Sequence, residues 1–378
     1  MDINGFLSAV EDTLGIDTYY GVPDSLLKAL GDELYARYGI GSKHVISADE
    51  GGAVGLAAGH YLATGKSAAV YMQNSGIGNA VNPICSLLNE KVYAIPTLII
   101  VGWRGEPGVH DEPQHVFQGE CSEELLKSIG LSVDIIDEET TAESLAAILE
   151  SIAKRFAEGK SASLLVRKGA LTREEKPKYT NSNTMTRESI VEAVTEKLPA
   201  NTAIVSTTGK LSRELFEIRE RRGESHESDF LTVGSMGHSS MIGLGIALAQ
   251  PERPVLVFDG DGAVLMHMGA MPVLSSLKPS QLVHILVNNE AHESVGGLPT
   301  SSGCVDWAQI ARACGYKKVC SAQTKEEIDA ALGSIDWNNI DGPVFIEIAA
   351  NLESRADLGR PTTSAYDNGK RFQAFLSE

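Results

Sequence analysis

The sequence predicts an α/β protein made of two doubly wound domains, each with a parallel sheet covered by helices on both faces. Three observations lead to this prediction. The chain of 378 residues is longer than one hydrophobic core usually serves. Short apolar segments alternate with helical segments in both halves of the chain. A polar segment without apolar periodicity, residues 171–186, separates the two halves.

The predicted strands are short segments rich in Val, Ile and Leu that end at Gly or at polar turns. In the first half they cover residues 67–72, 97–102 and 163–167. In the second half they cover residues 203–206, 255–258, 283–287 and 344–348. Helices are predicted between them, for example over residues 142–156 and 190–198. Parallel strands need crossover connections of this kind, so the alternation indicates parallel sheets.

Residues 171–186 form the predicted linker. They read LTREEKPKYTNSNTMT, which is polar and contains one proline. Thr186 suits the N-cap of the helix that follows. We therefore expect a first domain of residues 1–170 and a second of residues 187–378, with no further domain between them.

Composition and charge exclude several functional classes. Fifty acidic against 32 basic side chains give a formal charge of −18, which argues against a nucleic-acid partner. An anionic substrate would need a local basic pocket. The five cysteines form no CxxC pair, which fits buried thiols in a reducing compartment. The first 15 residues lack the basic region of a signal peptide, and the apolar runs are too short to span a membrane. We expect a cytoplasmic protein without a membrane partner.

One motif carries most of the chemistry. The predicted strand 255–258 is followed by Asp259-Gly260-Asp261-Gly262, and residues 263–287, 25 in all, separate this motif from Asn288-Asn289. In a βαβ unit this spacing returns the chain to the neighbouring parallel strand. Asp261 and Asn289 should therefore emerge side by side at the carboxyl edge of the sheet, where open α/β sheets bind ligands.

The residue types at this edge suit a metal and a phosphate group. Carboxylate and amide oxygens are hard ligands for Mg²⁺, so Asp261 and Asn289 are the predicted ligands, with Ala291 as a third predicted position. Gly260 and Gly262 allow a close approach of the backbone to a diphosphate. The helix predicted to start near Ala263 offers free N–H groups to it.

The spaced GDG and NN motifs resemble the signature of thiamine-diphosphate enzymes. Residues 47–65 are similar to the glutamate segment of these enzymes, and residues 73–79 to their glycine-rich loop. Gly234-Ser235-Met236-Gly237 precedes the motif as a GxMG-type segment does, with Met236 25 positions before Asp261. The resemblance implies that Glu50 hydrogen-bonds the pyrimidine ring of the cofactor and that Met236 supports its bent conformation. Residues 1–170 would be the pyrimidine-binding domain and residues 187–378 the domain binding diphosphate and Mg²⁺.

Five further segments look like the phosphonopyruvate decarboxylase family: residues 20–28, 111–115, 208–215, 292–297 and 357–361. This resemblance implies decarboxylation of 3-phosphonopyruvate to phosphonoacetaldehyde and CO₂, with thiamine diphosphate and Mg²⁺ as cofactors. It also implies a homo-oligomer with active sites between subunits.

The implied substrate carries a second anionic group, and basic residues near the predicted sheet edges are candidates to bind it. These candidates are Arg104, Lys210, Arg213 and Arg360. Histidines are candidates for proton delivery to the intermediate because they exchange protons near neutral pH. They are His110, His115 and His292.

Other functions fit the sequence less well. Sulfopyruvate decarboxylation is the chief alternative, because sulfonate and phosphonate are similar anions, although fusion of the two domains in one chain favours phosphonopyruvate. Pyruvate decarboxylation or carboligation would need no second anion pocket. An NAD-dependent oxidoreductase also uses doubly wound sheets, but the sequence lacks a GxGxxG turn with an acidic residue at the required distance. A catalytically inactive subunit would be expected to lack Glu50 or Asp261.

Overall fold

The computed structural model describes residues 1–111, 113–175 and 177–378. The chain forms two compact units, Met1–Lys178 with Ser294–Pro299, and Tyr179–Glu293 with Thr300–Glu378. The division after Lys178 lies within the polar segment 171–186. The association of Ser294–Pro299 with the first unit is not predicted from the sequence. Glu112, in the segment 111–115, and Lys176, in the predicted linker, lie outside the described residues.

The first unit is built on a six-stranded parallel sheet with the strand order β2-β1-β3-β4-β6-β5. Its strands are β1 (Tyr19–Gly21), β2 (His44–Ile46), β3 (Ala69–Gln73), β4 (Leu98–Gly102), β5 (Ser132–Ile136) and β6 (Ala162–Val166). Its helices are α1 (Ile3–Leu14), α2 (Lys28–Tyr38), α3 (Glu50–Thr64), α4 (Ile77–Pro83), α5 (Pro113–Ser128) and α6 (Ala142–Ala157). Short helical turns, η1 (Asn74–Gly76) and η2 (Ile84–Leu88), flank α4.

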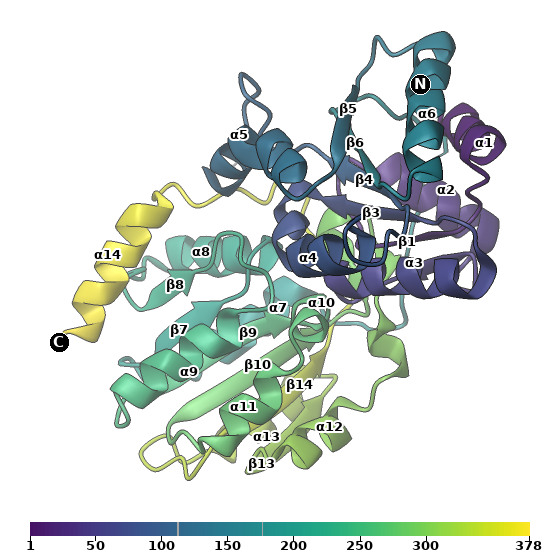
Figure 1. Cartoon of the computed structure of the whole chain (residues 1–378). Coiled ribbons are helices and arrows are strands. Elements are labelled where there is room, and N and C mark those ends of the chain that lie inside the picture. The colour runs from purple at the N-terminus through teal and green to yellow at the C-terminus, as the bar shows by residue number, and fades with distance from the viewer. Residues whose placement is uncertain (112, 176) are drawn as a thin grey trace. The chain divides into compact units, whose positions relative to one another are not determined.

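Helices cover both faces of this first sheet (Figure 1). On one face α1, α2 and α6 bury residues such as Phe6, Leu30 and Leu149 against the strands. On the other face α3, α4 and α5 contribute residues such as Val54 and Leu126. The fold of this unit therefore follows from apolar strands that are buried on both sides.

The second unit has a six-stranded parallel sheet with the order β13-β14-β10-β9-β7-β8. Its strands are β7 (Ala203–Ser206), β8 (Asp229–Leu231), β9 (Val255–Gly260), β10 (Leu282–Asn288), β13 (Lys318–Ala322) and β14 (Val344–Ala349). Its helices are α7 (Arg187–Thr195), α8 (Lys210–Arg222), α9 (Ser239–Ala249), α10 (Asp261–Met266), α11 (Ala270–Ser276), α12 (Trp307–Cys314), α13 (Lys325–Gly333) and α14 (Ala365–Leu376). The segment after β10 holds β11 (Ala291–His292), η3 (Glu293–Val295), β12 (Leu298–Pro299) and η4 (Ser301–Cys304).

Two apolar clusters lie on the two faces of this second sheet. Helices α7, α8 and α13 pack on one face, and α9, α11, α12 and α14 pack on the other (Figure 1). The prediction of two doubly wound parallel sheets is thus confirmed. The strands missing from the prediction are the short ones, β1, β2 and β8, and the partly polar β5 and β13, whose sequences lack a continuous apolar run.

Two remaining expectations concern the cysteine thiols and the absence of membrane-spanning segments. The prediction of buried thiols is wrong, because Cys85 and Cys304 are exposed and the other three cysteines are half-buried. All five lie within helices or strands, at positions that these elements leave partly or fully exposed. Within the described residues, no helix is both long and apolar enough to cross a bilayer.

Candidate active site

The structure brings Asp261 and Asn289 together at the carboxyl edge of the second sheet. Strand β9 ends at Gly260 and α10 begins at Asp261, while β10, the parallel neighbour of β9, ends at Asn288. The backbone N–H of Asn289 donates a hydrogen bond to the Asp261 carboxylate. The expected βαβ geometry therefore places both side chains at one point of the sheet edge.

Asp261 is a buried carboxyl with several hydrogen-bond donors around it. Its side chain is 3% exposed, and Thr300 Oγ1 donates to Oδ2 over 2.5 Å. Burial raises the pKa of Asp261 to about 6, against the effect of Thr300 and of the backbone N–H groups of Asp261, Gly262 and Asn289. A bound cation would reverse this balance, because it favours the ionised form. The environment is that of a carboxylate suited to a positive partner.

Asp261 and Asn289 offer carboxyl and amide oxygen atoms at this edge of the sheet. The described residues contain no cluster of three or more His, Cys, Asp or Glu side chains suited to a metal. Asn289 Oδ1 accepts one hydrogen bond, from the N–H of Ala291 over 3.1 Å, and retains capacity for a second partner. Carboxylate and amide oxygens are ligands that Mg²⁺ prefers, so Asp261 and Asn289 could hold this ion.

The neighbouring residues of both motifs have structural roles. Asp259 lies within β9 and is 1% exposed, and its Oδ2 is 3.6 Å from His284 Nε2 in the core. Asn288 Oδ1 accepts from Ser302 Oγ over 2.8 Å, and its Nδ2 donates to Glu347. Asp259 and Asn288 therefore have partners within the protein, whereas the predicted ligands Asp261 and Asn289 lie at the edge of the sheet.

Met236, Gly262 and His292 meet next to this edge. A Cβ atom on Gly262 would lie 3.3 Å from Met236 Cε and 3.4 Å from His292 Cε1, so any side chain there would crowd both. Glycine at position 262 therefore keeps the backbone accessible beside Met236 and His292, where a Cβ atom would be in tight contact with both side chains. Met236 of the segment 234–237 and His292 of the loop after β10 thus both lie against the GDG turn.

Two non-glycine residues at this site have left-handed backbone conformations. They are Ser235, with φ of 45°, and Glu290, with φ of 60°. Such conformations are unfavourable for residues with a Cβ atom and cluster at functional sites. Both residues are adjacent to predicted cofactor or metal residues, Met236 and Asn289. Three further non-glycine residues, Ala94, Lys278 and Gln281, have the same conformation away from the site, so this conformation is not specific to it.

His292 has surroundings that keep its ring neutral. Its ring packs against Gly262, and burial lowers the pKa of His292 to about 4. At neutral pH this side chain can donate and accept hydrogen bonds, but it is not a cationic acid. The two histidines of the first unit that are predicted to deliver protons, His110 and His115, are less buried than His292. His110 is exposed in the loop after β4, and His115 is half-buried in the first turn of α5.

Glu50 is the first residue of α3 in the first unit, after the N-cap Asp49. Its side chain is 4% exposed, and Asn79 Nδ2 donates to Oε2 over 2.8 Å. Burial raises the pKa of Glu50, and the hydrogen bond from Asn79 opposes this change. A buried carboxyl with one amide partner is a candidate proton-exchanging group.

The predicted substrate cations of the second unit all have partners in this structure. Lys210 pairs with Glu293 and donates to Ser354 Oγ over 2.9 Å. Arg213 donates to the backbone oxygens of Gly359, over 2.6 Å, and of Leu358. Arg360 is exposed. Lys210 therefore reaches the residue after His292, whereas Arg213 mainly anchors the segment that carries Arg360.

Arg104, the predicted substrate cation of the first unit, is held by a carboxylate. Its Nε donates to Asp111 Oδ2 over 2.7 Å, and Nη1 donates to Ser25 Oγ over 3.0 Å. The backbone oxygen of Arg104 accepts from Asn74 Nδ2. The three segments 20–28, 73–79 and 102–111 thus meet around this arginine, and an anionic ligand would have to compete with Asp111.

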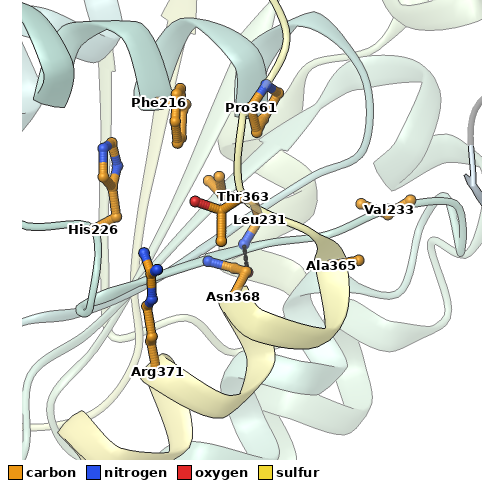
Figure 2. A pocket seen from close by; sticks show the side chains of 9 residues that line it. All are labelled: Phe216, His226, Leu231, Val233, Pro361, Thr363, Ala365, Asn368 and Arg371. Carbon is orange, nitrogen blue, oxygen red and sulfur yellow. Dashed lines mark hydrogen bonds between the residues drawn. The ribbon is translucent and has the colours of Figure 1, made fainter.

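A crevice beside α14 in the second unit has none of these residues in its lining (Figure 2). It is lined by Phe216, His226, Leu231, Val233, Pro361, Thr363, Ala365, Asn368 and Arg371. Asn368 Oδ1 accepts from the N–H of Leu231 over 3.0 Å and thereby ties α14 to β8. Mostly apolar walls and the absence of any predicted site residue from this lining indicate a packing gap beside α14 rather than a catalytic pocket.

Three side chains at the site are missed by sequence reasoning. Thr300 bonds Asp261, Glu293 bonds Lys210, and Asn181 Nδ2 donates to the backbone oxygen of Asn289 over 3.0 Å. Asn181 lies in the segment predicted as a mere linker. No local pattern marks these residues, because each contact joins positions far apart in the chain.

Comparison with known families defines the class of protein. The profile of the thiamine pyrophosphate enzyme N-terminal TPP-binding domain matches residues 3–126, and that of the C-terminal TPP-binding domain matches residues 207–348. The two matches fall on the two parallel sheets. The chain is therefore a thiamine pyrophosphate enzyme, with Glu50 in the N-terminal domain and Asp261 and Asn289 in the C-terminal one.

Full-length relatives narrow this class. A phosphonopyruvate decarboxylase of Streptomyces viridochromogenes is 35% identical and aligns with 96% of this chain and 92% of its own. One from Streptomyces hygroscopicus is 34% identical over 97% of this chain and 92% of its own. A sulfopyruvate decarboxylase of Methanosarcina acetivorans is 29% identical over 73% of this chain and 74% of its own. The chain belongs to the phosphonopyruvate decarboxylase family.

Proposed function

We propose that this protein catalyses the decarboxylation of 3-phosphonopyruvate to phosphonoacetaldehyde and CO₂, with thiamine diphosphate and Mg²⁺ as cofactors. The observation that carries this proposal is the similarity to phosphonopyruvate decarboxylases over nearly the whole chain. The buried Glu50 and the Asp261–Asn289 pair support it, because an inactive relative would not need either.

The residues of the second unit fit the diphosphate end of the cofactor. Asp261 and Asn289, with the backbone at Ala291, would hold Mg²⁺. Gly260, Gly262 and the first N–H groups of α10, including that of Ala263, would accommodate the phosphates. Gly234, Ser235 and Met236 would support the ring system. The Cβ-free space at Gly262, bounded by Met236 and His292, is the structural observation that fits this role.

The chemistry divides between the cofactor and the protein. When bound, thiamine diphosphate supplies the electron sink that allows CO₂ to leave. Glu50 holds a proton at its carboxyl group and returns it during the reaction. One proton replaces CO₂ on the keto carbon, and His110 and His115 are the proposed sources. His292 contributes as a neutral hydrogen-bonding group, because its pKa is lowered to about 4.

The phosphonate of the substrate requires cations, and Arg104, Lys210, Arg213 and Arg360 are the proposed ones. Lys210 and Arg104 already contact a carboxylate, Glu293 and Asp111 respectively, and Arg213 contacts backbone carbonyl oxygens. Binding would therefore exchange a protein partner for the substrate anion. Domain fusion does not distinguish phosphonate from sulfonate, because the Methanosarcina sulfopyruvate decarboxylase matches 73% of this chain in a single chain.

Substrate preference is tested by comparing kcat/KM for phosphonopyruvate, sulfopyruvate and pyruvate at equal concentrations of cofactor. We expect phosphonopyruvate to exceed pyruvate by at least roughly 100-fold, because two charge-assisted hydrogen bonds to the second anion are absent with pyruvate. Lys210→Ala should lower the ratio of kcat/KM for phosphonopyruvate to that for pyruvate, mainly because KM for phosphonopyruvate rises. A higher kcat/KM for sulfopyruvate than for phosphonopyruvate would overturn the proposed substrate.

We also propose that the protein is a homo-oligomer with active sites between subunits. The resemblance to thiamine-diphosphate enzymes implies this arrangement. Two helices that directly follow cofactor segments are apolar on nearly all sides, α3 and α9. Leu62 on α3 is 74% exposed and Leu248 on α9 is 52% exposed. A helix that is apolar all round is normally covered, and a second copy of the chain would cover these faces.

Charge introduced at these faces should dissociate the assembly. We expect Leu62→Glu and Leu248→Glu to produce a smaller species than wild type in sedimentation or light-scattering measurements. Leu277→Glu is the matched control, because Leu277 is also 52% exposed but lies after α11. Either a monomeric wild type or unchanged mass in both variants would exclude this interface.

A further inference from the structure

The carboxyl group of Glu50 lies in a cradle formed by the segment from Asn74 to Pro83. Helices α3 and α4 pack against each other, and η1 leads directly into α4. The glutamate is the first residue of α3, and Asp49 caps this helix by accepting the N–H of Gly52 over 2.8 Å. The start of α3 is therefore fixed, and the surroundings of the carboxyl come from the other segment.

Asn79 contacts this helix start in two ways. Its Nδ2 donates to Glu50 Oε2 over 2.8 Å. Its backbone oxygen faces Gly51, where an added Cβ atom would lie 2.9 Å away. One residue of α4 thus holds the side chain of Glu50 and also packs closely on the backbone of the next residue. A substitution at Asn79 would therefore act directly on the Glu50 carboxyl group.

Gly76 completes the cradle on the other side of the carboxyl. A Cβ atom at Gly76 would lie 2.2 Å from Glu50 Oε1, a distance that no packed pair of atoms allows. The carboxyl therefore rests against the Cα of Gly76, with its second oxygen bonded to Asn79. These two residues together hold the glutamate side chain in one orientation.

The charges around Glu50 are few. Burial raises its pKa, and so does the nearby carboxylate of Asp49, while the Asn79 amide and the backbone N–H of Glu50 lower it. From the elements that pack on α3 in the described residues, β1, β3, α4 and η2, no lysine or arginine contributes to this balance. The other titratable side chains on α3 and these elements are Tyr19, Tyr20, His60, Tyr61, Tyr71 and Cys85, and none of them is among the groups that shift the pKa of Glu50. The Asn79 amide is therefore the strongest side-chain influence that favours the ionised form.

We propose that Asn79 is the positioning residue for Glu50: its amide holds the carboxyl against Gly76 and favours the ionised state. This inference rests on the proposed function only in giving Glu50 a catalytic purpose. A glutamate that must take up and release a proton each cycle needs both forms to be accessible, and burial alone would leave it protonated. Asn79 restores the balance without a positive charge, which would hold the glutamate permanently ionised.

The test follows the protonation of Glu50 in cofactor-free protein. The side-chain carboxyl carbons of glutamate are labelled, and the Glu50 signal is identified by its loss in Glu50→Gln. Its NMR titration midpoint is then compared between wild type, Asn79→Asp and Asn79→Ala. Asn82→Asp is the matched control, because Asn82 is exposed one turn further along the same helix and gains the same charge without a hydrogen bond to Glu50.

We expect the midpoint to rise by about one pH unit or more in Asn79→Asp, which replaces a donor by a like charge. In Asn79→Ala it should rise by less, and in Asn82→Asp it should not change. The acidic limb of the kcat/KM profile should move by the same amounts in active protein. An unchanged midpoint in the Asn79 variants, or an equal rise in Asn82→Asp, overturns the proposal.

The failure of this inference is distinguishable from failure of the proposed function. If the midpoint moves as expected but no 2-oxo acid is decarboxylated, the hold on Glu50 stands and the proposed reaction is wrong. If CO₂ is released by wild type but the midpoint does not respond to Asn79, the positioning role is wrong and the reaction stands. Should Asn79→Asp fail to fold, Asn79→Ala alone decides, since it adds no charge and removes the same hydrogen bond.

Discussion

Replacing Glu50 with glutamine is expected to lower kcat by roughly 10²–10⁴-fold, while the dissociation constant for thiamine diphosphate changes little. Glutamine has the shape of glutamate, and its carbonyl oxygen can still accept the hydrogen bond from Asn79. It cannot hold and return a proton. CO₂ release at saturating substrate, together with a cofactor titration followed by intrinsic fluorescence, measures both quantities. Near-wild-type turnover in this variant would exclude Glu50 as the proton-exchanging residue.

The same variant should make the cofactor-free protein more stable. Because burial raises the pKa of Glu50, the folded state disfavours the ionised form. This penalty is absent below the pKa of the unfolded chain, grows as the pH rises through the raised pKa, and remains above it. Glu50→Gln should therefore melt at a higher temperature than wild type near about pH 7 and at the same temperature near about pH 4. The exposed Glu150→Gln serves as the control, with no difference expected.

Asp261→Asn is expected to weaken Mg²⁺ binding by at least roughly 100-fold, because the charged ligand is lost at a site with few protein donors. Thiamine diphosphate affinity measured with Mg²⁺ should fall together with it, and turnover should follow. Isothermal titration of Mg²⁺ in the presence of the cofactor gives the affinity. Unchanged affinities would rule out Asp261 as a ligand and leave its burial without a functional reason.

Without metal and cofactor, the sign of the effect of Asp261→Asn reverses. The pKa of this carboxyl is raised from 3.8 to about 6, which corresponds to about 3 kcal/mol of destabilisation at neutral pH. The penalty is absent below about pH 4 and complete above about pH 6, so the variant should melt higher than wild type only in the upper range. Adding Mg²⁺ and cofactor should stabilise wild type and not the variant. An equal response of both proteins would contradict the assignment.

The elements that could be predicted from the sequence are those whose signal is local. Strand β7 has the predicted bounds, and β9 and β10 differ from the prediction only by residues at their ends. Their apolar runs are long enough to identify buried strands. The edge strands β2 and β8 are three residues long and partly polar, so their sequences resemble loops.

The candidate site shows the same limit. The proximity of Asp261 and Asn289 follows from the spacing of one βαβ unit. The pairing of Lys210 with Glu293, 83 positions away, depends on the tertiary fold and has no sequence signal. Asn79 lies in the glycine-rich segment 73–79 that the sequence pattern identifies. Only the structure shows that the side-chain amide of Asn79 donates a hydrogen bond to Glu50. The sequence likewise indicates that Arg104 and Lys210 lie near the sheet edges, but not that Asp111 and Glu293 pair with them.

CO₂ release from phosphonopyruvate by protein stripped of thiamine diphosphate and Mg²⁺ tests most directly whether this chain is a cofactor-dependent decarboxylase. We expect no release from the stripped protein, full release of CO₂ and phosphonoacetaldehyde when both cofactors are added back, and no recovery in Asp261→Asn under the same conditions. Release that persists without the cofactors would contradict the proposed reaction, as would stripped protein that rebinds both and still releases no CO₂.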